Sequence, residues 1–345
     1  MDTLPLETLQ HIFQLACTDG AYTGCSLSLV SHAVRTIACT ARFHSVSLDA
    51  SLHRLQVFVD LYQRECDLGQ KYKPRVRHLH VSFPFIPPRN PRASDLQPTA
   101  TPEYLSAAQT LFQLVAADLV TLVVQFTNGG SMNLPLIARP FPHLLEATFV
   151  GVQDFRTLLS TSEDANSATP LFPVMSHVYV VPSRRPGALC LPFWAANAPR
   201  ATHLSVSRAE DHLEEISAAV GVRVRLERSW YRMNVDWDRD PGPPSPPTFE
   251  LPLTPTYPSV RHLLVQPGPG PVGARCGNAW MGHNQRRLGL RQMGRSCRAI
   301  GVEVVEAEAL VYGKSIYETV RHGWLARIND SGDAMGFLGA VAHRR

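Results

Sequence analysis

Glycine-containing loops are the first places where this sequence could do chemistry, because the backbone N–H groups of such loops can hold a phosphate. Gly268, Gly270 and Gly273 have the G-x-G-x-x-G spacing of a dinucleotide-binding turn and directly follow a predicted strand. Pro269 and Pro271 remove N–H groups that this turn would use. No acidic residue stands about 20 residues further on to bind a ribose. The sequence therefore predicts a rigid surface loop here.

Other catalytic and metal-binding motifs are missing from the sequence. Gly313-Lys314-Ser315 ends like a P-loop, but Glu308 takes the place of the motif's first glycine and would face a phosphate. There is no HExxH, no GxSxG and no paired-cysteine metal spacing. His78 and His80 would share one strand face, which would allow a metal pair, although we favour a polar position at the rim of the sheet. We therefore expect no enzyme activity, no catalytic residue, no metal and no cofactor.

An arginine-rich segment at 286–298 is the strongest local charge feature. It contains no acidic residue, and three of its arginines have helical spacing. We favour a solvated helix face; the alternative is a docking strip for an acidic partner or a phosphate backbone. The net charge of +4, from 33 basic and 29 acidic residues, is too small to indicate a nucleic-acid or membrane partner. The five arginines are Arg286, Arg287, Arg291, Arg295 and Arg298.

The chain contains two segments with different sequence patterns, and either of them could position partner-binding residues. The 345 residues leave room for about two domains. In residues 1–48, apolar side chains recur at spacings of three and four and glycines separate the runs, which predicts three short amphipathic helices. Pro5 suits the first turn of the first helix. The apolar positions are Leu6, Leu9, Phe13 and Ala16, then Leu27 and Val30, then Val34, Ile37, Ala38 and Ala41.

From Phe43 onward, predicted strands alternate with predicted helices. This alternation favours parallel strands with crossover helices, and its irregular spacing favours a solenoid with insertions, the clearest being proline-rich segments at 84–102 and 240–258. The predicted strands are Phe43–Leu48, His78–Phe83, Thr121–Phe126, Leu145–Val150, Val178–Val181, His203–Ser207, Val222–Leu226, His262–Val265 and Val302–Val305. The predicted helices are Ser51–Cys66, Glu103–Leu119, Val152–Ser160, Ala209–Val220 and Arg286–Cys297.

The cysteines and the apolar stretches bear on the cellular compartment. The seven cysteines are odd in number, form no CxxC pair and follow no signal segment, which predicts reduced thiols. The most apolar stretch, 114–124, is interrupted by Asp118 and is shorter than the about 20 residues of a membrane-spanning helix. We therefore expect a cytoplasmic or nuclear protein without a membrane partner.

The first 48 residues resemble an F-box. The resemblance rests on the run from Leu4-Pro5 to Ile12-Phe13, on 27–31, and on Arg35. More narrowly, residues 16–31 resemble the F-box-like proteins of mushroom-forming fungi. The tail from Tyr312 to Ile328 and the later strands are similar to the degenerate leucine-rich repeats of such proteins, without a regular asparagine ladder. The fold that this implies is α/β: a three-helix F-box, 1–48, followed by an irregular leucine-rich-repeat-like solenoid, 49–345.

This resemblance implies a non-catalytic adaptor of a Skp-cullin-F-box ubiquitin ligase. The helices would bind the Skp adaptor and, through it, the cullin core, while the repeat region would bind an unknown protein substrate. Val34 stands where many members of the family have tryptophan, so the resemblance implies that a large anchor is missing. A binding scaffold that does not assemble a ligase is the alternative. The adaptor-facing residues implied by the motif are Leu4, Pro5, Leu9, Ile12, Phe13, Val30 and Val34.

Overall fold

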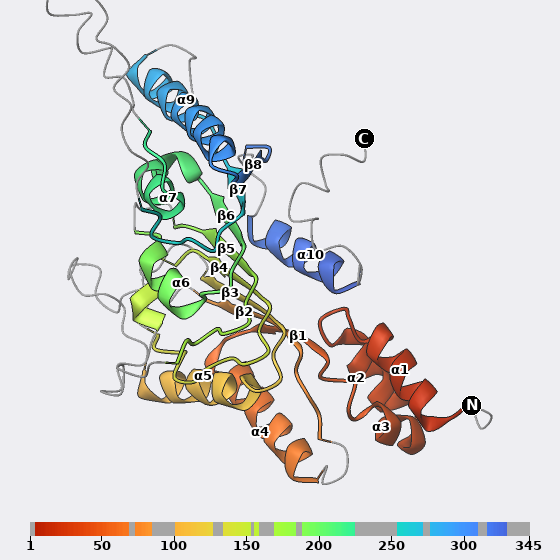
Figure 1. The fold of residues 1–345 in the computed structure, drawn as a ribbon. Helices are drawn as coiled ribbons and strands as arrows, with labels where there is room; N and C mark the ends of the chain where they lie inside the picture. The colour runs from red at the N-terminus through yellow and green to blue at the C-terminus, as the bar shows by residue number, and fades with distance from the viewer. Residues whose placement is uncertain are drawn as a thin grey trace, which may run out of the picture.

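A computed structural model of the chain has an α/β fold built on one eight-stranded parallel sheet (Figure 1). The order of the strands in the sheet is their order in the sequence. The structure describes residues 4–68, 73–84, 101–126, 134–152, 155–158, 169–183, 188–224, 254–271, 277–309 and 316–329. The strands are β1 (Ser45–Asp49), β2 (His78–Phe83), β3 (Thr121–Phe126), β4 (Glu146–Val150), β5 (His177–Val181), β6 (His203–Ser207), β7 (His262–Gln266) and β8 (Glu303–Glu306).

The crossover helices lie on one face of this sheet (Figure 1). Parallel pairing requires each connection to return the chain to the same end of the sheet, and a helix does this while covering the apolar face. The helices are α4 (Leu52–Leu68), α5 (Pro102–Val115), α6 (Leu191–Asn197), α7 (Leu213–Val220) and α9 (Asn278–Ala299), with the short 3-10 helices η2 (Phe155–Leu158) and η3 (Ala209–Asp211).

The two faces of the sheet differ in chemistry because side chains alternate along each strand. The register aligns one apolar row beneath the crossover helices, and every member of it is buried: Val46, Leu79, Leu122, Ala147, Val178, Leu204, Leu263 and Val304. The neighbouring position of each strand gives a polar row on the opposite face: Ser45, His78, Thr121, Glu146, His177, His203, His262 and Glu303.

Helix α10 (Ile316–Asn329) lies across this polar face, opposite the crossover helices (Figure 1). Its buried side chains Val320 and Trp324 pack on a second apolar cluster that includes Val123, Val150 and Tyr179. The polar face is therefore covered by one helix along part of its width.

The N-terminal helices form a separate small bundle beside β1 and the end of α10 (Figure 1). They are α1 (Leu6–Ala16), α2 (Tyr22–Val30) and α3 (His32–Ala38), and the three helices predicted from the sequence are thus present. Ser31 caps α3 by accepting a hydrogen bond from the backbone N–H of Val34. Polar links attach the bundle to the rest: for example, Arg42 pairs with Glu65 of α4 at 2.7 Å, and the Ser45 hydroxyl donates to the Cys17 carbonyl at 2.7 Å.

The structure corrects several predicted elements. No strand forms at 222–224, where the chain leaves α7 through the left-handed Gly221, and the rest of the strand predicted at 222–226 lies outside the described residues. Of the helix predicted at Val152–Ser160, the described residues contain the 3-10 helix η2, and the remaining positions from 153 to 160 lie outside the described residues. The tail that resembled a further repeat contributes α10 on the opposite face, and α6 was not predicted. The proline-rich insertions at 84–102 and 240–258 lie largely outside the described residues.

Candidate functional site

The N-terminal bundle exposes several large apolar side chains. Leu15 is 60% exposed, Leu29 86% and Val30 66%. They remain exposed because the bundle core is small: it consists of Phe13, Cys17, Val34, Ala38 and Ala41, with Leu27 and Ile37 at its edge. Three short helices offer little interior, so apolar positions on their outer sides have nothing within the bundle to pack against.

The structure divides the seven implied adaptor-facing residues into two groups. Leu4, Pro5 and Ile12, at the start and on the outer side of α1, are exposed, and so is Val30 at the end of α2. The other three, Leu9, Phe13 and Val34, are each at most 6% exposed. The seven residues therefore do not form one surface; four are accessible and three hold the helices in place.

Val34 is part of the bundle core, where its neighbours include Phe13 and Cys17. A tryptophan at this position would have to displace these side chains, because close-packed interiors do not accept extra volume without strain. Leu15, Tyr22 and Leu29 are exposed apolar residues that the motif did not indicate. Leu15 could have been identified from the sequence, because it lies three residues after Ile12 and therefore on the same side of α1.

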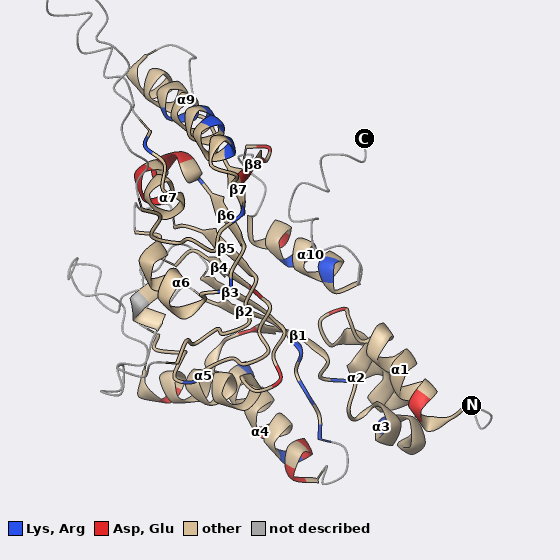
Figure 2. Cartoon of the chain, viewed as in Figure 1, with Lys and Arg blue, Asp and Glu red and all other residues tan. Residues whose placement is uncertain are grey.

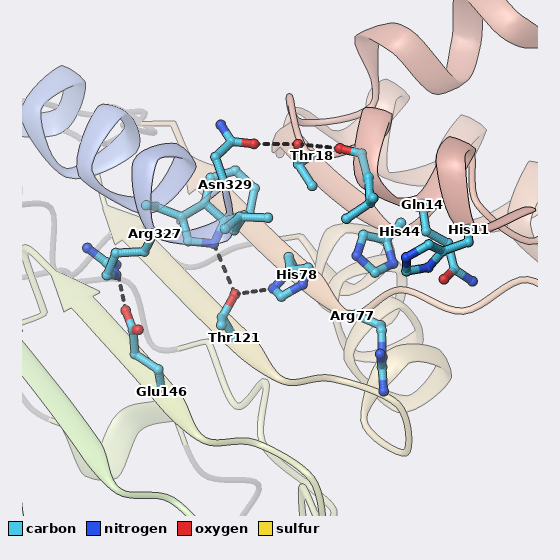
Figure 3. A pocket seen from close by; sticks show the side chains of 13 residues that line it. His11, Gln14, Thr18, His44, Arg77, His78, Thr121, Glu146, Arg327 and Asn329 are labelled. Atoms are coloured by element: carbon cyan, nitrogen blue, oxygen red, sulfur yellow. Dashed lines mark hydrogen bonds and ion pairs between the residues drawn. The ribbon is translucent and has the colours of Figure 1, made fainter. Parts of the chain in front are cut away.

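Helix α10 is held on the polar face by hydrogen bonds and an ion pair (Figure 3). The Trp324 indole N–H donates to Thr121 Oγ1 at 3.1 Å, and Arg327 pairs with Glu146. At the end of the helix, the Thr18 hydroxyl donates to the side-chain oxygen of Asn329. Helix α10 therefore touches both the sheet and the loop that follows α1.

His80 is buried beneath α10 and does not lie at the rim of the sheet. Arg321 Nε donates to Ser47 Oγ at 3.2 Å, Ser47 Oγ lies 3.2 Å from His80 Nδ1, and His80 Nε2 lies 3.2 Å from Gln125 Oε1. Because Gln125 Oε1 only accepts, Nε2 carries the proton and Nδ1 accepts from Ser47. Burial lowers the pKa of His80 to about 4, which agrees with a neutral ring. Both ring nitrogens are thus engaged, and the described residues contain no metal-binding group of three ligands.

Three further histidines stack across the strands at the start of β5, β6 and β7. The His177 and His203 rings are 4.2 Å apart and nearly parallel, and the His203 and His262 rings are 4.3 Å apart. Glu303 ends the row, with Oε2 3.0 Å from His262 Nδ1. Burial, together with the neighbouring His177 and His262, lowers the pKa of His203 to about 4. The three histidines are half-buried and Glu303 is exposed, so this polar row is partly accessible to solvent.

A pocket of about 320 Å³ lies where α1, the start of β2 to β4 and the end of α10 meet (Figure 3). The N-terminal bundle contributes His11, Gln14, Leu15 and Thr18. The sheet contributes His78, Thr121 and Glu146, preceded by His44 and Arg77, and α10 contributes Trp324, Arg327, Ile328 and Asn329. No stretch of sequence contains these residues together, so sequence analysis did not find the pocket.

The loop at Gly268 and the arginines of α9 are the two described features that could have bound a phosphate. Both make contacts within the chain. The buried Glu210 carboxylate already accepts the N–H of Gly268 at 2.8 Å, so this amide is not available to a phosphate. Basic residues are visible in blue along α9 (Figure 2). Of these, Arg286 pairs with Asp211 and Arg287 with Glu306. The remaining arginines of α9 lie on its exposed side, which agrees with a solvated face at the end of the sheet. Gly273 and Gly313-Lys314-Ser315 lie outside the described residues.

In the described part of the chain, no helix is long and apolar enough to cross a membrane. No protein-family model matches the sequence, and no curated protein is significantly similar to it. Function must therefore be argued from the residues and the geometry above.

Proposed function

We propose that this protein is a non-catalytic substrate-recognition adaptor of a Skp-cullin-F-box ubiquitin ligase. The observation that carries the proposal is the exposure of apolar residues on and next to α1 and α2, among them Leu4, Pro5, Ile12 and Val30. Such a surface on short helices suits a partner that buries it in a groove. Its residues lie within the segment whose sequence resembles an F-box. The helices would bind the Skp adaptor and, through it, the cullin core.

The sheet region, in this proposal, is an irregular leucine-rich-repeat-like solenoid that binds the protein substrate. Its strand order, which follows the sequence, is the order that stacked repeats produce. The interval from Thr121 to Glu146 is 25 residues and that from His177 to His203 is 26, within the about 20 to 29 of leucine-rich repeats. The longer intervals before β3 and β7 contain the proline-rich insertions. Such a protein would act by proximity, holding the substrate near a ubiquitin-conjugating enzyme.

The links between the bundle and the sheet support this role. Arg42 and Glu65 join the turn after α3 to α4, and Thr18 and Asn329 join the bundle to α10. An adaptor that raises effective concentration works best when its two binding surfaces keep a fixed separation, because a loose connection dilutes the effect. Contacts from both sides of the sheet restrain the bundle in this way.

Co-expression of the full chain with a Skp adaptor, followed by size-exclusion chromatography and calorimetric titration, tests the proposal. We expect a one-to-one complex. The double variant Ile12→Glu, Val30→Glu places charges on the exposed surface without removing core contacts, and should weaken binding at least about ten-fold. The matched control is Leu288→Glu on α9, where the leucine is 60% exposed and distant in sequence from the bundle. A folded wild type that forms no complex, or equal losses in both variants, would contradict the proposal.

A scaffold that binds proteins without assembling a ligase is the second candidate, and Val34 is the observation that favours it. Val34 fills a core position where the family often has tryptophan, so its side chain offers no large anchor to a partner. This function predicts a folded protein that makes no stable adaptor complex and whose binding surface is the sheet region alone.

A further inference from the structure

A row of three imidazoles lies on the polar face of the sheet, where β5, β6 and β7 begin. The parallel register places His177, His203 and His262 side by side on these strands. The rings of His203 and His262 are 4.3 Å apart and within 13° of parallel, and those of His177 and His203 are 4.2 Å apart and within 17°. These strands lie toward the end of the sheet away from the N-terminal bundle (Figure 1). The row is therefore separate from the surface proposed to bind the Skp adaptor.

The hydrogen bonds of the two outer rings leave a lone pair on the Nε2 atom of each ring. His262 Nδ1 lies 3.0 Å from Glu303 Oε2, and an ionised carboxylate only accepts, so the proton of the neutral His262 ring is on Nδ1. His177 Nδ1 lies 2.8 Å from Ser176 Oγ, whose hydroxyl donates to the Leu145 carbonyl at 3.2 Å. Ser176 Oγ therefore accepts from Nδ1, and His177 also keeps its lone pair on Nε2.

The middle ring, His203, is held in a similar way. Its Nδ1 lies 2.9 Å from the Thr202 hydroxyl, which leaves Nε2 for another ligand. Burial, together with the neighbouring His177 and His262, lowers the pKa of His203 to about 4, so the ring is neutral at pH 7, the form that binds metal ions. A metal-binding histidine usually donates its other ring N–H to a carboxylate or another oxygen, which is the arrangement of His262 and Glu303.

Charges at the two ends of the row favour a cation at the His262 end. At the other end, the Arg327 guanidinium on α10 acts together with burial to lower the pKa of His177, so a positive charge already lies near that ring. Beyond His262, the Glu303 carboxylate supplies a negative charge. The side chains of His262 and Glu303 are 37% and 60% exposed, so an ion from solvent can reach this end. His203 and His262 are thus the two rings best placed to share a cation.

We propose that His203 and His262 bind a divalent transition-metal ion of the Zn²⁺ type through their Nε2 atoms, while Glu303 orients His262. Imidazole nitrogens suit Zn²⁺, Cu²⁺ and Ni²⁺, whereas Mg²⁺ and Ca²⁺ prefer oxygen ligands. Two nitrogens bound at about 2.0 to 2.1 Å to a tetrahedral ion lie about 3.4 Å apart. The two rings are 4.3 Å apart, so they must close by about 1 Å, which rotation about the Cβ–Cγ bond allows because this torsion is broad in histidine.

The two histidines would form an open metal site. The described residues contain no group of three metal ligands, so water completes the coordination of an ion bound by these two rings. The affinity should therefore be lower than that of closed four-ligand zinc sites, with a Kd on the order of 10 µM. The proposal does not depend on ligase assembly, because it concerns only residues of this chain.

Calorimetric titration of the full chain with Zn²⁺, in a buffer that does not bind metals, tests the site. We expect saturable binding of one ion per chain. Cu²⁺ should bind more tightly and Mg²⁺ should not bind measurably, following the preference of imidazole. Cys25→Ser, which removes an exposed thiol that could also bind Zn²⁺, should change the affinity less than about two-fold. Absence of saturable Zn²⁺ binding, or loss of binding in Cys25→Ser, would overturn the proposal.

Three matched variants locate the ion. His203→Gln and His262→Gln should each weaken Zn²⁺ binding about ten-fold or more, because each leaves a single nitrogen ligand. His53→Gln removes an exposed imidazole of α4 and should leave the affinity unchanged. Glutamine retains hydrogen-bonding groups, and circular dichroism checks that each variant is folded. Equal affinities in the three variants would show that the ion is bound elsewhere and would overturn the site.

Long-range proton–nitrogen correlation NMR of the histidine rings gives a readout that a loss of folding cannot imitate. Before Zn²⁺ is added, we expect Nε2 of His262 to carry no proton. Zn²⁺ should then shift the Nε2 signals of His203 and His262 and leave that of His53 in place. Glu303→Gln should weaken Zn²⁺ binding about ten-fold, whereas Glu103→Gln, which removes the same charge from the exposed side of α5, should not. Zn²⁺ shifts confined to other histidines would contradict the proposal.

Discussion

The N-terminal bundle and the sheet differ in the number and size of the apolar side chains that they bury. The largest apolar cluster described in the bundle consists of five buried side chains, two of them alanines, and Leu15, Leu29 and Val30 are exposed. The sheet is packed by large rings, such as Trp194, whose centroid lies 5.1 Å from those of Phe149 and Phe155. A sheet covered by helices has an interior to fill, whereas three short helices have almost none.

This difference separates side chains that matter for stability from side chains that are exposed to solvent. Residues of the sheet core should matter mainly for stability, because their side chains touch only other parts of the chain. In the bundle, neighbouring positions of a single helix separate the two roles: Phe13 is 4% exposed and Ile12 is 44% exposed. In the bundle, therefore, a change in sequence can alter the exposed apolar surface without altering the fold.

The largest effect should come from the helix that joins the two regions. Trp324 is fully buried on the polar face, and its indole N–H donates to Thr121. Trp324→Ala should lower the free energy of unfolding by about 3 to 5 kcal/mol, as for other large-to-small changes in cores. Chemical denaturation followed by circular dichroism measures this loss. A loss below about 1 kcal/mol would mean that α10 contributes little to holding the fold together.

A pair of neighbouring substitutions in α1 tests whether the bundle separates core from surface. Phe13→Ala should cost about 3 kcal/mol or more, because it leaves a cavity among Cys17, Val34 and Ala38. Ile12→Ala removes an exposed side chain and should change stability by less than about 0.5 kcal/mol. Thermal and chemical denaturation of both variants give the comparison. Equal costs would show that the outer side of α1 is packed in the folded protein.

Acidification should destabilise the sheet region through its buried histidines. The pKa of His80 is lowered from 6.5 to about 4, so the folded protein binds fewer protons at this ring than the unfolded chain does. Its contribution to stability is therefore present above pH 6.5 and is lost as the pH falls toward 4. The loss for this ring is about 2 kcal/mol between pH 6.5 and pH 5. His44, His78 and His203 are shifted in the same direction.

Denaturation curves at several pH values measure this slope, and His80→Gln is the informative variant. Glutamine keeps hydrogen-bonding capacity but cannot take up a proton in this range, so the variant should be less stable at pH 7.5 and should lose less on acidification. A variant with the same slope as the wild type would show that His80 does not contribute to the acid sensitivity.

Local sequence pattern was sufficient for most strands of the sheet, although not for the one predicted at 222–226. The strands predicted at His78–Phe83, Thr121–Phe126 and His203–Ser207 have the bounds found in the structure, because a short run of β-branched residues and leucines is a local property of the sequence. Helix α10 was missed because its apolar positions are mixed with charged ones such as Arg321 and Arg327. Those charges are explained only by partners on distant strands, here Ser47 and Glu146.

The candidate sites were less accessible to sequence analysis than the fold. In α1, the apolar residues cover about half of the helix circumference and Ile12 lies beside Leu9 and Phe13 on that half, so periodicity alone could not tell the buried Leu9 and Phe13 from the exposed Ile12. The pocket is assembled from α1, from residues 44–146 and from α10, and no spacing of residues in the sequence predicts it. The sequence can indicate a segment that resembles a known motif, and packing decides which residues of that segment are accessible.

The smallest predicted effect tests whether the bundle and the sheet unfold as one unit. The Asp19 carboxylate accepts hydrogen bonds from the backbone N–H of Thr23 at 2.9 Å and from the Thr23 hydroxyl at 2.6 Å, at the start of α2. Asp19→Ala should cost about 1 kcal/mol, as the loss of a helix cap does, whereas Asp60→Ala on the exposed side of α4 should cost nothing measurable.

Hydrogen exchange by region distinguishes the two possible responses to Asp19→Ala. If the links through Arg42–Glu65 and Thr18–Asn329 couple the two regions, the loss should appear in the sheet as well as in the bundle, because one cooperative transition shares it. Faster exchange confined to α1, α2 and α3 would instead show that the bundle opens on its own. The bundle would then be a weakly stable unit that a bound partner orders, and its small core would be the physical reason.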